Sequence, residues 1–159
     1  MKPMRCAVIL VALAGALATA GAASAQELKF EADLSGAAER PTPVVTDGVG
    51  EAKFETDGTS VAFELKWDDL STPAVAGHIH CGGPEQAGSV GVTLLASRMG
   101  TEGEVHGTFT APDAPASGNA CGWDDLADVL AAMTAGTAYV NIHTTRNRGG
   151  EIRGQVTAD

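Results

Sequence analysis

The stretch VAFELKW at residues 61–67 carries large apolar side chains at every second position. These are Val61, Phe63, Leu65 and Trp67, and small or charged residues stand between them. Successive side chains of a β-strand point to opposite faces of the sheet, so the pattern predicts a strand with one buried face and one exposed face. It decides the fold class, because the same period of two recurs along most of the chain.

The period of two predicts seven further strands, which are separated by clusters of Gly, Pro and Asp. They cover residues 28–34, 51–55, 75–80, 90–96, 105–110, 138–144 and 152–156. Only Trp123–Met133 has apolar residues at helical spacing, with aspartates near its start and Gly136 beyond its end. We therefore predict an all-β fold, an antiparallel Greek-key-like β-sandwich of about eight strands with one short inserted helix.

The first 25 residues have the composition of a secretory signal peptide. Lys2 and Arg5 precede an almost wholly apolar run from Ala7 to Ala20, and Ala23-Ser24-Ala25 forms a small-x-small cleavage site. The apolar run is shorter than the ~20 residues that span a bilayer. We predict cleavage after residue 25, one domain over residues 26–159, and export to the periplasm or the exterior with no membrane span left.

Charge and cysteine content restrict the function further. The 159 residues include 20 acidic and 10 basic side chains, for a net charge of −10, which deepens to −12 once Lys2 and Arg5 are removed. Nucleic acids and anionic membranes both need a basic face, so they are excluded as partners. Removal of Cys6 leaves Cys81 and Cys121, and an even pair in an exported chain predicts one disulfide. The alternative is two free thiols.

The histidines are the candidate functional residues. His78 and His80 lie two positions apart in a predicted strand, so their rings share one face, roughly 7 Å apart along it. His143 lies on the polar face of its own predicted strand. Three or four imidazoles suit copper or zinc, so we predict a metal site of His78, His80 and His143, with His106 as the candidate fourth ligand. The alternative is that these histidines are half-exposed polar residues without a ligand.

Three polar residues are expected to support this site. Asn141 shares the face of His143, two positions away. Gly149-Gly150 predicts a hairpin turn, and matching the apolar faces across it places Glu151 and Arg153 on the face of His143. A carboxylate next to a histidine fixes its tautomer and orientation, as it does around metal-binding imidazoles.

Several segments together resemble the CHRD domain, the module first described in chordin. They are Leu34-Ser35-Gly36 with Glu39 and Pro41, Ala76-Gly77-His78-Ile79-His80, Ala138-Tyr139-Val140-Asn141-Ile142-His143-Thr144, and Gly150-Glu151-Ile152-Arg153-Gly154-Gln155. The resemblance covers nearly all of residues 28–157. It implies an extracytoplasmic β-sandwich, common in exported bacterial proteins, with no established enzymatic activity. The chain departs from the usual pattern in placing Cys81 where a Gly commonly follows His-Ile-His.

Three functions stay open at this point. The first is an exported binding module that holds copper or zinc, or another ligand, at its histidine-lined rim. The second is a redox enzyme, because a His-x-His strand in a Greek-key sandwich is similar to half of the copper site of Cu/Zn superoxide dismutases. Such an enzyme needs further ligands, and its anionic substrate would be repelled unless Arg146, Arg148 and Arg153 create a local positive field. The third is a domain that binds an extracellular protein ligand, in which the histidines only pack.

Overall fold

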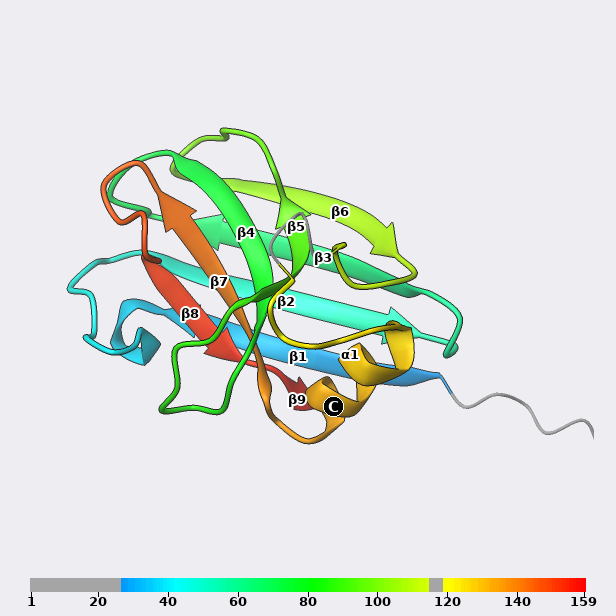
Figure 1. Cartoon of the computed structure of the whole chain (residues 1–159). Coiled ribbons are helices and arrows are strands. Elements are labelled where there is room, and N and C mark those ends of the chain that lie inside the picture. Colours follow the sequence, from blue (N-terminus) through cyan, green and yellow to red (C-terminus); the bar gives the residue numbers. More distant parts are fainter. Residues whose placement is uncertain (1–26, 115–118) are drawn as a thin grey trace, which may run out of the picture.

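The computed structural model describes residues 27–114 and 119–159 (Figure 1). The predicted signal peptide at residues 1–25 lies outside the described residues. In the described part, the strands are β1 (Leu28–Ser35), β2 (Val49–Thr56), β3 (Val61–Asp68), β4 (Ala74–Cys81), β5 (Val90–Leu95), β6 (Gly103–Phe109), β7 (Ala138–Thr144), β8 (Ile152–Gln155) and β9 (Thr157–Ala158). The helices are the 3-10 turn η1 (Gly36–Ala38) and the α-helix α1 (Leu126–Thr134).

One antiparallel sheet folds over on itself to make both layers of the domain. Its strand order is β5-β4-β7-β8-β1-β2-β3-β6, and β9 pairs with β1 at the side. Figure 1 shows β4, β7 and β8 crossing over β1, β2 and β3. The chain changes layers after β3, β5 and β6, and again after β8, because β9 pairs with β1. The predicted all-β antiparallel sandwich with one short helix is confirmed.

The core lies between the two layers and follows the period of two. In β3, Val61, Leu65 and Trp67 are buried, while Phe63 is only partly covered. The facing layer contributes a matching set of fully buried aliphatic side chains, namely Ile79, Val140, Ile142 and Ile152. Because neighbours in a strand alternate between faces, burying Ile79 turns His78 and His80 to the outer face of β4.

The helix begins three residues later than the sequence pattern predicts. Asp125 is its N-cap, since its side chain accepts a hydrogen bond from the N–H of Asp128 at 3.2 Å. Trp123 lies outside the helix and packs against Gly91, where a Cβ would lie 2.1 Å from the indole ring. Beyond the C-terminal end, Gly136 adopts a left-handed conformation with φ of 65°. No helix in the described ranges is long and apolar enough to cross a membrane.

A disulfide joins Cys81 at the end of β4 to Cys121 in the segment before α1. The two Cα atoms are 5.6 Å apart, within the usual range for a disulfide. The predicted pairing is confirmed. The bond ties the crossover between β6 and β7 to the strand that carries His78 and His80.

Candidate metal centre

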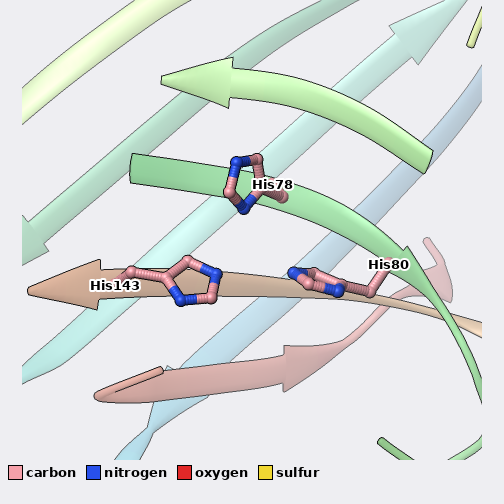
Figure 2. Close-up of side chains that lie close together, drawn as sticks. All are labelled: His78, His80 and His143. Carbon is pink, nitrogen blue, oxygen red and sulfur yellow. The ribbon is translucent and has the colours of Figure 1, made fainter. Parts of the chain in front are cut away.

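Three histidines from two neighbouring strands converge on the outer face of the sheet. β4 pairs directly with β7, so Ala76 lies opposite His143 and His78 lies opposite Asn141. One ring nitrogen from each of His78, His80 and His143 lies within 4.8 Å of the other two. Figure 2 shows the three rings turned toward a common point between the strands. The structure thus brings together the three histidines that the sequence singles out.

Two of the three imidazoles have their tautomer fixed by the backbone. His143 Nδ1 lies 2.9 Å from the carbonyl oxygen of Arg148, and His80 Nδ1 lies 3.1 Å from that of Gly88. A carbonyl oxygen only accepts, so in both rings Nδ1 carries the proton and Nε2 presents a lone pair. Metal-binding histidines are commonly oriented in this way.

Three further ring nitrogens, one from each histidine, are buried and have no hydrogen-bond partner among the described residues. These are His80 Nε2, His143 Nε2 and His78 Nδ1. Buried polar atoms are nearly always satisfied, because leaving them unpaired is unfavourable. A single ion bound between the three rings would satisfy all three atoms.

The histidines are uncharged at neutral pH. Burial lowers the pKa of His78 to about 4, and the neighbouring His143 lowers it further. Burial also lowers the pKa of His80 to about 4 and lowers the pKa of His143. A neutral imidazole has the free lone pair that a metal ion needs, so the cluster is in its ligand form at neutral pH.

A loop at residues 82–89 covers His80 and is held by side chains from β7 and β8. The Tyr139 ring stacks on His80, with ring centroids 4.9 Å apart and planes within 8°. The N–H of Gly88 donates a hydrogen bond to the Tyr139 hydroxyl at 3.0 Å. The carbonyl oxygen of Gly88 accepts the hydrogen bond from His80 Nδ1. Arg153 lies 3.5 Å above the Tyr139 ring and donates to the carbonyls of Gly83 and Gln86. Tyr139 therefore positions His80 both by stacking and through Gly88.

Replacing Tyr139 with phenylalanine should lower the free energy of unfolding by about 1–2 kcal/mol. The ring and its stacking stay in place, but Gly88 N–H loses its acceptor in a part-buried position. Urea unfolding of the variant beside the wild type measures this loss. An unchanged free energy of unfolding would show that the loop does not depend on the Tyr139 hydroxyl.

Arg153 and Asn141 share the outer face with the histidines, as expected. They lie opposite each other in the β7–β8 pairing, and both are buried. Asn141 Nδ2 donates to Glu39 Oε1 at 2.7 Å. Glu39 follows η1, far from β7 in sequence, and burial raises its pKa to about 7 despite the bond from Asn141. Glu39 is not among the predicted site residues, because nothing near it in the sequence signals contact with β7.

Glu151 is not next to His143, and its expected place has to be corrected. Its carboxylate accepts hydrogen bonds from Thr144, whose side chain alternates with that of His143, and from Thr46, Ser71 and Asn147. Glu151 lies at the end of the turn, just before β8 begins at Ile152. Its backbone N–H donates a hydrogen bond to the carbonyl oxygen of Ile142 in β7. The strand register therefore does not govern its side chain.

His106 is not brought to the other three histidines either. It lies on β6, opposite Glu64 of β3, and its ring contacts Glu104 and Glu64 on the exposed face of that layer. Its place on a predicted strand made it a candidate ligand, but the crossover from β5 to β6 takes that strand to the far end of the sheet. His106 and the two glutamates form a separate, exposed group.

The geometry defines a class of protein: an antiparallel β-sandwich with a cluster of three neutral histidines on its outer face. The family is given by comparison with protein-family models, since the model of the CHRD domain matches residues 30–156. The chain belongs to the CHRD domain family. Searches of the curated proteins and of the solved structures each found no match.

Proposed function

We propose that the protein is an exported CHRD module that binds one transition metal ion, copper or zinc, through His78, His80 and His143. The observation that carries the proposal is the convergence of three buried ring nitrogens without partners. The N-terminal composition and the disulfide support export to an oxidising compartment.

The chemistry of the donors suits these two metals. Three neutral imidazoles are borderline ligands, preferred by copper and zinc over magnesium or calcium, which take oxygen ligands. Two of the rings are held in the required tautomer by backbone carbonyls. Three protein ligands leave one position on a four-coordinate ion for a further ligand, as in many zinc sites that bind water.

Alanine at His78 or at His143 should weaken the binding of Cu(II) or Zn(II) tenfold or more. Each substitution removes one of three donors, and neither removed ring fills the core between the two sheet layers. Isothermal titration of the folded protein with each metal measures the affinity and the stoichiometry. His106→Ala is the matched control, because that ring lies on β6 and its removal should leave the affinity unchanged.

Stoichiometric binding of equal affinity in both His78→Ala and His143→Ala would contradict the proposal. Far-UV circular dichroism of each variant separates the loss of a ligand from the loss of the fold. The absence of any stoichiometric metal binding by the wild type would contradict the proposal directly.

The geometry gives less support to a two-metal dismutase than to a binding module. A bridging imidazole would have to come from His106, the fourth histidine of the chain, which lies at the far end of the sheet. Arg153 is buried and bonded to the 82–89 loop, so its guanidinium is not free to attract an anionic substrate. A dismutase assay of the metal-loaded protein should give rates no better than the free metal.

A further inference from the structure

Asn141 lies on the same face of the sheet as the three histidines. It lies directly opposite His78 and two residues before His143 on the same face, and the side chain is only 2% exposed. Its Oδ1 is buried and has no hydrogen-bond partner among the described residues. Directly opposed side chains in an antiparallel pair have Cβ atoms about 4.5–5.5 Å apart, so the Asn141 side chain starts beside that of His78, on the face that carries the three histidines.

Glu39 fixes the orientation of the Asn141 amide. Asn141 Nδ2 donates to Glu39 Oε1 at 2.7 Å, so Oδ1 is the end of the amide that Glu39 does not bind. The ionised carboxylate only accepts, and in that form it holds the amide in this orientation. Glu39 is itself buried, at 4% exposure, and reaches this place from the turn after η1. While Glu39 is ionised, the amide cannot exchange its two ends without placing two oxygens against each other.

Gly150 keeps the space for this pair. A Cβ on Gly150 would lie 2.4 Å from Asn141 Nδ2 and 2.6 Å from Glu39 Oε1, and the residue has a φ of +129°, which side chains rarely adopt. The turn between β7 and β8 thus packs its backbone directly on the bonded amide and carboxylate. A Cβ there would also lie 2.7 Å from Asn141 Oδ1, so the turn packs on a buried oxygen acceptor that stands on the face carrying the histidines.

We propose that Asn141 Oδ1 accepts a hydrogen bond from the exogenous ligand at the open position of the metal, and that Glu39 is the positioning residue that aims it. The inference rests on the proposed function, because it needs an ion held by the three histidines. An acceptor at that place selects ligands that bear a proton, such as water or an alcohol. It disfavours anions without one, such as azide, since these place a lone pair against a carbonyl oxygen.

The test is the affinity of the Cu(II)-loaded protein for azide, followed by its charge-transfer absorption. Asn141→Leu removes the acceptor at similar volume, so the bound water loses a hydrogen bond and azide should displace it about tenfold more tightly. Glu39→Leu frees the amide without altering the face of the site and should shift the azide affinity in the same direction. Glu39→Gln still offers an acceptor to Asn141 Nδ2 and should behave as the wild type.

Copper titrations of the same variants make the outcomes distinct. Equal azide affinity in Asn141→Leu, Glu39→Leu and the wild type, at unchanged copper affinity, would overturn this inference and leave the proposed function standing. A tenfold loss of copper affinity in Asn141→Leu would also overturn it, because the oxygen would then be a direct ligand. A wild type that binds no Cu(II) would overturn both proposals.

Discussion

Replacing Glu151 by glutamine should lower the free energy of unfolding by about 3 kcal/mol at neutral pH. The side chain is fully buried, and its carboxylate accepts hydrogen bonds from the Thr46, Ser71 and Thr144 hydroxyls, the Ser71 N–H and Asn147 Nδ2. These donors come from the loop before β2, the β3–β4 connection and the β7–β8 turn. Glutamine replaces one carboxylate oxygen by an NH2 group. This donor would then face one of the present donors at a buried position, and both would lack an acceptor.

The size of this effect follows from the pKa of Glu151. Burial acts to raise that pKa, but the hydrogen bonds from Ser71, Thr144, Thr46 and Asn147 outweigh burial and lower it from 4.5 to about 2. A lowered carboxyl pKa stabilises the folded state above the unfolded-state value near 4.5, and the contribution is lost as the pH falls through about 2. Glutamine does not titrate, so the stability gap between wild type and variant should stay constant above about pH 5 and shrink below it.

Urea unfolding of both proteins between pH 7 and pH 2.5 measures this gap. Glu31→Gln is the matched control, since Glu31 is an exposed carboxylate on β1, and it should change the stability by less than about 0.5 kcal/mol. A gap that is absent at pH 7, or that is as large at pH 2.5 as at pH 7, would contradict the role assigned to Glu151.

The period of two in the sequence predicts eight of the nine strands in the described residues and the outward face of the histidines, but not the two-residue β9. In β4 and β7 the pattern is unambiguous, because Ile79 and Ile142 must enter the core and therefore turn His80 and His143 away from it. The helix was placed three residues too early because the aspartates before it were assigned to its first turns, whereas Asp125 is the cap. Local pattern determines faces well and element boundaries less well.

The neighbours of the site depend on long-range pairing, which local pattern does not encode. The adjacency of β4 and β7 brings His143 to His78 and His80, and the path of β6 separates His106 from them. Glu39 reaches Asn141 across 102 positions, and Gly88 bonds His80 with a backbone carbonyl. Neither contact corresponds to a residue spacing or a motif in the sequence from which it could be predicted. Glu151 was misplaced because strand register was extended one residue into a turn.

Replacing both Cys81 and Cys121 by alanine should lower the free energy of unfolding by about 4 kcal/mol. The bond closes a loop with a sequence separation of 40, and a crosslink of that length restricts the unfolded chain by about this amount in the chain-entropy model. The unfolded variant is also less compact, so the dependence of its stability on urea concentration should steepen. Reducing the wild type should give the same loss, and the double variant should not respond to the reductant.

The same variant separates the stability of the fold from the geometry of the site. Cys81 follows His80 directly, but His80 is oriented by the Gly88 carbonyl and by stacking on Tyr139, and both contacts remain without the disulfide. Copper affinity of the folded double variant should therefore fall less than that of His78→Ala. A double variant as stable as the wild type would contradict the structural role of the bond. A copper affinity reduced as far as in His78→Ala would show instead that the disulfide holds the loop at residues 82–89 in place over His80.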